Sequence, residues 1–313
     1  MLKKKTKLNV DKKRLCFNQP KELFEELKQY PKESYINYDD FQLYIFDDGR
    51  VDEEEEPRKI KAVVILPDKS SLGAFTFTGY KIKGKIYCYF DFENRALYKV
   101  ENRDIQGNKY NGEAYLPYIA NILGLRLNNY TEIEIALDVN HNVIAKIRKL
   151  IKDHENYDMF LNGKKITDND RKIEGYLEIY ERSRNKLDKY PTLFFKQKKS
   201  GSPTIRVYNK TKEIAASGKE YISEWDEFGR QDIYRIEVNV KNEYYKDFAK
   251  SLQDDIRYNA IAGEIEGQDS LLLSDEYKHT IWQYFALRMV YFRSKRGNRD
   301  IITLEDIAEG EAL

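Results

Sequence analysis

The chain has few of the residues that build zinc sites or disulfide frameworks. Its 313 residues include 2 cysteines and 3 histidines. Cys16 and Cys88 lie far apart and form no C-x-x-C pair, which argues against both kinds of site. No apolar run approaches the roughly 20 residues that a membrane helix needs. No apolar segment follows the lysines at positions 3–5 either, so we expect no membrane partner, no secretory signal and a cytoplasmic location.

An excess of either charge is also lacking. The 54 Lys and Arg residues nearly balance the 53 Asp and Glu residues, which leaves a formal net charge of +1. The total charge therefore does not indicate a nucleic-acid partner, but its distribution is uneven. Between residues 182 and 212 there are ten basic residues and one acid, Asp188. This run predicts either a solvated basic surface or a groove for a polyanion, and we favour the groove because the run leads into a strand with a reactive face.

The hydrophobic patterns predict an α+β fold. β-Branched and aromatic runs predict strands at 62–66, 74–78, 86–92, 131–139, 175–183, 193–198, 204–210 and 234–241. Helical periodicity is found at 20–27, 115–123, 143–151, 243–252 and 276–293. Strands grouped in this way favour a central, largely antiparallel sheet with flanking helices over βαβ repeats.

The same patterns suggest three consecutive parts. Residues 1–56 are expected to form a polar segment with one short helix, and its acidic run at 52–56 predicts a loop or linker. Residues 57–250 are expected to form one large domain, and 251–313 a helical C-terminal extension. Aromatic residues around Trp282 are expected in the core of that extension, and the basic residues after them offer phosphate contacts.

The predicted strand at 204–210 carries reactive groups on one face. Ile205 and Val207 alternate with Arg206, Tyr208 and Lys210. A phenolic oxygen between two cations suits attack on a phosphodiester, because the cations lower the pKa of the phenol and hold the phosphate. The sequence therefore predicts that Tyr208 is a nucleophile and that Arg206 and Lys210 neutralise the developing charge.

Two further strands carry carboxylates opposite their apolar residues. Glu134 and Asp138 share one face of 131–139, and Glu237 lies on the polar face of 234–241. If the three strands are neighbours, these carboxylates form one site, and oxygen ligands favour Mg²⁺ or Mn²⁺ over zinc. Such a cation would polarise the scissile phosphate. Amphipathic strands with a charged solvent face are also the ordinary form of an antiparallel sheet, so that alternative stays open.

Other residues complete the predicted site. Glu213 is either a further ligand or an ion-pair partner of the local cations. His141 follows Asp138 closely, and it is either an additional ligand or a loop or helix-capping residue. The predicted DNA contacts are Lys196, Lys198, Lys199, Arg235 and Lys241.

These segments resemble a family of plasmid replication initiators. Residues 205–213 read Ile-Arg-Val-Tyr-Asn-Lys-Thr-Lys-Glu and are similar to the R-x-Y-[ND]-K-x-x-E motif of trans-acting rolling-circle initiators. Residues 235–241 resemble the R-x-E-[VI]-x-x-K segment that follows it in the family. Residues 132–138 resemble the upstream R-x-D-x-A-x-D strand. The resemblance spans about 62–245, with the motifs in matching order.

The resemblance implies an enzyme that nicks one DNA strand at an origin. Family members cut through a catalytic tyrosine, stay linked to the 5′ phosphate and leave a free 3′ hydroxyl for a polymerase. The residues that match the nucleophile, the flanking cations and the acidic positions are Tyr208, Arg206, Lys210, Glu134, Asp138 and Glu237. The implied cofactor is Mg²⁺ or Mn²⁺. The implied partners are a single-stranded or cruciform origin, a host helicase and polymerase, and a second copy of the chain.

Two positions depart from the family pattern. Glu132 stands where the family has Arg, and Glu134 replaces the usual Asp. The chain also lacks the His-hydrophobe-His pair of the wider HUH nickase superfamily, which the trans-acting initiators lack too. The filamentous-phage gene II nickases are similar in this respect. We therefore expect an HUH-nickase-like fold with a degenerate histidine motif.

Three other functions remain as alternatives. Related proteins act as relaxases that start conjugative transfer. A non-catalytic DNA-binding protein would use the basic groove without chemistry. An unrelated nuclease would use the acids for metal-dependent hydrolysis without a covalent step.

Overall fold

The chain folds into two compact units in the computed structural model. The structure describes residues 6–47, 58–98, 102–103, 109–110, 112–166, 192–196, 201–219, 232–253, 275–296 and 300–310. The first unit comprises the described residues of Met1–Val10, Glu134–Asp255 and Leu273–Leu313, and the second comprises those of Asp11–Ile133. This division differs from the three consecutive parts predicted above, because the first unit draws residues from both ends of the chain.

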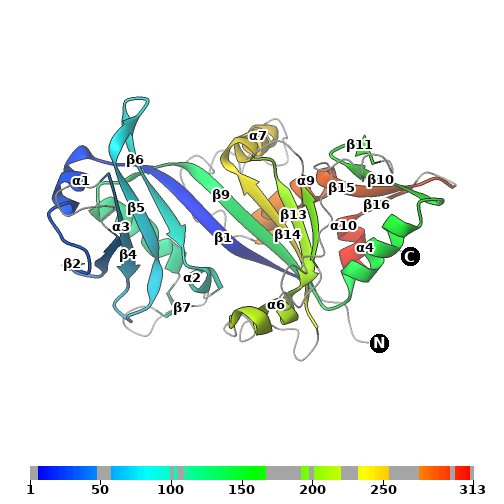
Figure 1. Cartoon of the computed structure of the whole chain (residues 1–313), viewed down its shortest axis with the longest axis horizontal. Coiled ribbons are helices and arrows are strands. Elements are labelled where there is room, and N and C mark those ends of the chain that lie inside the picture. The colour runs from blue at the N-terminus through cyan, green and yellow to red at the C-terminus, as the bar shows by residue number, and fades with distance from the viewer. Residues whose placement is uncertain are drawn as a thin grey trace. The chain divides into compact units, whose positions relative to one another are not determined.

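The second unit is built on one sheet (Figure 1). Its strand order is β9-β1-β6-β5-β4-β3-β2, and each of its strand pairs whose register is described is antiparallel. The strands are β1 (Thr6–Asn18), β2 (Tyr35–Asn37), β3 (Gln42–Asp47), β4 (Lys59–Ile65), β5 (Ser71–Ile82), β6 (Lys85–Phe92) and β9 (Arg126–Val139). β1 and β9 each have one portion in the first unit. The remaining elements are α1 (Lys21–Leu27), α2 (Asn94–Tyr98), α3 (Gly112–Ile122) and the strand pair β7 (Asn102–Arg103) and β8 (Lys109–Tyr110).

Aromatic side chains form the core of the second unit. Phe75, Phe77 and Phe90 are fully buried, and the Phe75 ring centroid lies 5.2 Å from that of Phe77 and 4.6 Å from that of Phe90. Helix α1 packs on β5. Gly79 permits this close approach, because a Cβ there would lie 2.5 Å from the Phe24 ring.

The first unit contains the strands that carry the predicted site. Its strand order is β12-β13-β14-β9-β1, and a second sheet has the order β11-β10-β15-β16. The strands are β10 (Tyr157–Leu161), β11 (Lys164–Lys165), β12 (Thr192–Lys196), β13 (Thr204–Asn209), β14 (Tyr234–Lys241), β15 (Val290–Ser294) and β16 (Ile301–Thr303). The helices are α4 (Val143–Lys152), α6 (Lys210–Ser217), α7 (Asn242–Gln253), α9 (Asp275–Met289) and α10 (Leu304–Glu309).

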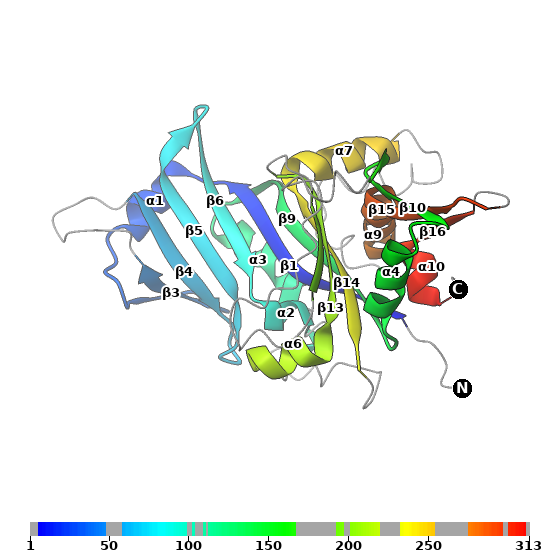
Figure 2. The same ribbon diagram turned by 45° about the vertical axis from the view of Figure 1, so that its right-hand side comes forward.

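Two helices cover β13 and β14. Helix α4 packs against β13, and α9 packs against β14 (Figure 2). Trp282 of α9 is fully buried, and its indole Nε1 donates a hydrogen bond to the Ile236 carbonyl at 3.1 Å. The prediction that the aromatic residues of this segment form core is therefore confirmed for Trp282, Phe285 and Phe292, which are all buried.

The predicted α+β class with a largely antiparallel sheet is confirmed, with three local corrections. Residues 6–18, expected within a polar segment, form the 13-residue strand β1. Lys210 begins helix α6 instead of ending a strand. The helix predicted at 276–293 ends at Met289, and β15 follows it directly. The strand predicted at 175–183 lies outside the described residues. Among the residues that the structure describes, no helix has both the length and the apolar character needed to cross a membrane.

Candidate functional site

Tyr208 stands at the junction of a strand and a helix. Asn209 ends β13 and caps α6, since its side-chain oxygen accepts a hydrogen bond from the Lys212 backbone N–H at 2.9 Å. Asparagine satisfies a free N–H at this position better than most residues, which is why the chain turns into a helix here. Lys210 is thus the first helical residue, yet its Nζ lies 5.7 Å from the centroid of the Tyr208 ring.

The strand register places the polar groups on a common face. Arg206 lies opposite Glu237, and Tyr208 lies opposite Arg235. Directly opposed residues of two strands point to the same side of the sheet. β14 also neighbours β9, which carries Glu134. The expectation that the three strands are neighbours is confirmed by this order, and the register places Arg206 and Glu237 on the same side of the sheet.

Arg206 connects two of the predicted acidic residues. Its Nη2 forms ion pairs with Oε1 of Glu134 and Oε1 of Glu237. The Arg206 side chain is 41% exposed, whereas both glutamate side chains are buried. Burial acts to lower the pKa of the Arg206 guanidinium, but Glu237 and Glu134 outweigh it, so the pKa is raised above the ordinary value. The guanidinium is therefore held charged between two carboxylates, with part of its surface open to solvent.

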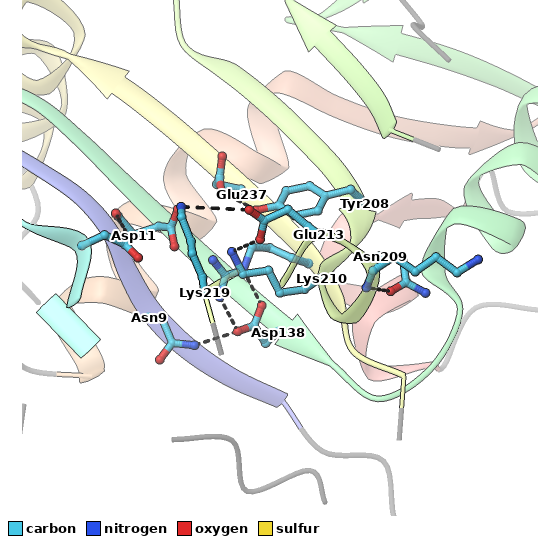
Figure 3. Close-up of polar contacts among 12 residues, drawn as sticks. Asn9, Asp11, Asp138, Tyr208, Asn209, Lys210, Glu213, Lys219 and Glu237 are labelled. Carbon is cyan, nitrogen blue, oxygen red and sulfur yellow. Dashed lines mark hydrogen bonds and ion pairs between the residues drawn. The ribbon is translucent and has the colours of Figure 1, made fainter. Parts of the chain in front are cut away.

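The Tyr208 hydroxyl contacts the same carboxylate from the other side. It donates a hydrogen bond to Oε2 of Glu237 at 2.9 Å (Figure 3). Tyr208 is only 6% exposed. The tyrosine is therefore covered, although its hydroxyl lies among polar groups and not in an apolar core. Arg206 is the part of this cluster that meets solvent.

Asp138 belongs to a separate ion pair. Its Oδ1 accepts from Arg235 Nε at 2.6 Å, its Oδ2 accepts from Arg235 Nη2 at 2.7 Å, and Oδ2 also accepts from Asn9 Nδ2 at 2.8 Å (Figure 3). Among the described residues, Asp138 is not one of the carboxylates whose oxygens lie within 4.8 Å of those of Glu134 and Glu237, so the structure does not group it with them as predicted. Arg235 is also corrected, because a fully buried side chain has no surface to offer to DNA.

Lys210 and Glu213 form a third pair. Lys210 is 1% exposed, and its Nζ lies 2.6 Å from Oε2 of Glu213. Lys219 Nζ lies 4.0 Å from the other oxygen of Glu213. Of the two roles predicted for Glu213, the structure shows the ion-pair partner of the local cations.

The remaining predicted residues lie in different surroundings. His141 Nε2 is 3.1 Å from the Ile307 carbonyl of α10, which fits a donor to the backbone. Lys196 is half-buried, with its Nζ 5.9 Å from the Phe194 ring centroid, and Lys241 is exposed. Lys198 and Lys199 lie outside the described residues.

The sequence reasoning missed Asn9, which helps to hold Asp138. Its strand was not expected, because four consecutive charged residues, 11–14, interrupt the apolar alternation. Just before these residues, the apolar Leu8 and Val10 alternate with Asn9, which is a pattern that indicates a strand.

The arrangement combines three chemical capabilities. A guanidinium at the exposed edge can receive a phosphate. A hydroxyl lies within hydrogen-bond distance of a buried carboxylate that can accept its proton. Two carboxylates have oxygens within 4.8 Å of each other, which suits a hard divalent cation.

Comparisons with known proteins leave the family open. No family model matches the chain, and no curated relative matches it. A solved structure of a rolling circle replication initiator protein from Geobacillus stearothermophilus is similar to it, with 15% sequence identity and a TM-score of 0.45. The match covers 95% of this chain and 89% of that chain. At this identity and TM-score, the similarity does not assign the chain to a family.

Proposed function

We propose that the protein initiates rolling-circle replication by nicking one DNA strand at an origin through Tyr208. The observation that carries the proposal is the pairing of the Tyr208 hydroxyl with Glu237, whose carboxylate also binds Arg206. A nucleophile, a proton acceptor and a phosphate-binding cation thus meet at one point. The resemblance of residues 205–213 to the initiator motif supports the same chemistry.

The nicking step follows from these contacts. The Tyr208 oxygen forms a bond to phosphorus, and the bond from phosphorus to the 3′ oxygen breaks. The phenolic proton has an acceptor in Glu237 Oε2, 2.9 Å away. Arg206 neutralises charge on the phosphate oxygens. The leaving 3′ oxygen takes up a proton from solvent, so the products are a 5′-phosphotyrosine link and a free 3′ hydroxyl.

Glu134 and Glu237 fit the metal that the sequence predicts. Their oxygens lie within 4.8 Å of one another, and both are carboxylates, as Mg²⁺ and Mn²⁺ prefer. Arg206 already places positive charge between them. A bound divalent cation would act as a Lewis acid on the scissile phosphate. Asp138 is not part of this group of carboxylates.

Metal binding should distinguish Glu134 from Glu213. We expect Glu134→Gln to weaken Mn²⁺ binding to the DNA-free protein by at least about 10-fold, because it removes one of two charged ligands. Glu213→Gln is the control, since the Glu213 carboxylate is bound to Lys210. Electron paramagnetic resonance titration of free Mn²⁺ measures both affinities. Unchanged affinity in Glu134→Gln, or an equal loss in Glu213→Gln, would contradict the assignment.

The proposed function is tested by trapping the covalent intermediate. Single-stranded oligonucleotides tiled across the DNA molecule that encodes the protein are incubated with it and Mn²⁺, then resolved on a denaturing gel. We expect a protein–DNA adduct from one tile, linked through the 5′ phosphate. Salt-sensitive binding without cleavage would indicate a non-catalytic DNA-binding protein, and free 5′ phosphate ends without attached protein would indicate a hydrolytic nuclease.

A further inference from the structure

The hairpin between β5 and β6 carries positive charge apart from the Tyr208 site. Residues 79–85 are all exposed, and they include Lys81, Lys83 and Lys85. No acidic residue occurs between Asp68 and Asp91. None of the three lysines forms an ion pair with a residue that the structure describes. The charge of the hairpin is thus left uncompensated in its own segment.

The hairpin has a defined two-stranded geometry. Lys81 pairs with Ile86 and Ile82 pairs with Lys85 across the two strands. The connecting residues Lys83 and Gly84 have φ of 51° and 81°. Positive φ at both residues is the mark of the two-residue turn whose twist matches that of the flanking strands. The lysines are therefore carried by a twisted β-ribbon and not by an irregular loop.

Apolar groups alternate with the lysines along this ribbon. Tyr80 is 52% exposed and Ile82 is 39% exposed. Lys81 and Lys85 each lie opposite an isoleucine, so both faces present a cation beside an apolar side chain. Three lysines without apolar neighbours could be explained as charges that keep the exposed strand edges from pairing with another chain. The exposed Tyr80 and Ile82 place apolar side chains beside the lysines on the same ribbon, so the hairpin offers both cationic and apolar contacts.

We propose that the hairpin Gly79–Ile86 is an arm that binds duplex DNA by entering one of its grooves. The choice of DNA as the ligand rests on the proposed function, in which the protein acts on DNA. The major groove of B-DNA admits a two-stranded β-ribbon. Lys81, Lys83 and Lys85 then contact phosphates along the groove walls, and Tyr80 and Ile82 contact base edges or sugars.

The test compares two triple variants with the same change in net charge. Lys81→Gln, Lys83→Gln and Lys85→Gln are combined in the hairpin variant. The control combines Lys21→Gln, Lys32→Gln and Lys69→Gln, three exposed lysines of the same unit. Binding to a short DNA duplex is measured by fluorescence anisotropy at several salt concentrations. We expect the hairpin variant to bind at least about 10-fold more weakly at low salt, with a salt slope reduced by up to about 2.7, that is about 0.9 for each of three phosphates.

A second variant separates groove contacts from charge. Tyr80→Ser combined with Ile82→Ser keeps all three lysines, so we expect weaker duplex binding with an unchanged salt slope. Equal DNA-duplex binding by the hairpin variant and its control overturns the inference. Binding to a double-stranded RNA of the same length is measured as well, and a loss of RNA binding without a loss of DNA binding also overturns it. Adduct formation on single-stranded oligonucleotides is measured in parallel. If the hairpin variant binds the duplex more weakly but the unmodified protein forms no adduct, the DNA-binding hairpin is supported and the proposed nicking function is contradicted. If the protein forms the adduct but the hairpin variant binds the duplex as well as its control, the nicking function is supported and the DNA-binding hairpin is contradicted.

Discussion

Tyr208→Phe is expected to abolish the covalent DNA adduct without unfolding the protein. The substitution removes the oxygen that attacks phosphorus and leaves the ring in place against Lys210. Removal of a covalent nucleophile lowers the rate by at least about 1,000-fold. The lost hydrogen bond to the buried Glu237 carboxylate costs about 1.5–3 kcal/mol of stability. The measurement is the yield of adduct on the cleaved oligonucleotide, read from a denaturing gel.

Tyr244→Phe provides a matched control in the same unit. Its hydroxyl forms a hydrogen bond with Ser202 Oγ at 3.1 Å, so this variant also loses one hydroxyl contact. We expect adduct formation close to that of the unmodified protein. If Tyr208→Phe still forms the adduct at the unmodified rate, another residue is the nucleophile. A loss of adduct in both variants would point to a general effect of removing hydroxyl groups.

Asp138→Asn is expected to destabilise the protein strongly. Arg235 is fully buried, and both oxygens of the Asp138 carboxylate accept hydrogen bonds from its guanidinium. Removing one partner of a buried ion pair leaves the other charge uncompensated, which costs about 3–5 kcal/mol. Denaturant unfolding, followed by circular dichroism, measures the change in the free energy of unfolding.

Asp158→Asn is the control for this ion pair. Asp158 binds Lys165 at 2.8 Å and Lys295 at 3.2 Å, and both lysines are at least 40% exposed. Solvent screens such a pair, so its loss costs less than about 1 kcal/mol. If Asp138→Asn leaves stability unchanged and weakens Mn²⁺ binding instead, Asp138 is a metal ligand and the sequence prediction is right on this point.

The elements that carry the site were predictable because their patterns are local. Alternation of apolar and polar residues in 131–139, 204–209 and 234–241 depends only on the two-residue period of a strand. The structure has β9, β13 and β14 there, with β14 between the other two. The alternation places Arg206, Glu134 and Glu237 each on the polar face of its own strand, and the order β13-β14-β9 makes these strands neighbours.

The pairing partners were decided only by the tertiary structure. Sequence spacing placed Glu134 and Asp138 together, since they share a face of one strand. Arg235 comes from another strand and binds Asp138, with Asn9 from a third, so Asp138 is separated from Glu134. The pairing of each arginine with its carboxylate depends on the strand order and on the register between strands. No single segment of the sequence contains that information.

Burial was the other property that the sequence left undetermined. By itself the sequence determined on which face of its own strand Arg206, Tyr208 and each carboxylate lies, and it favoured a largely antiparallel sheet. The tertiary structure decided that Tyr208 is covered, that its hydroxyl is bound to Glu237, and that Arg206 is the exposed edge of the cluster. The physical reason is that alternation along a strand specifies the face on which a side chain lies, whereas its exposure depends on the segments that pack over that face.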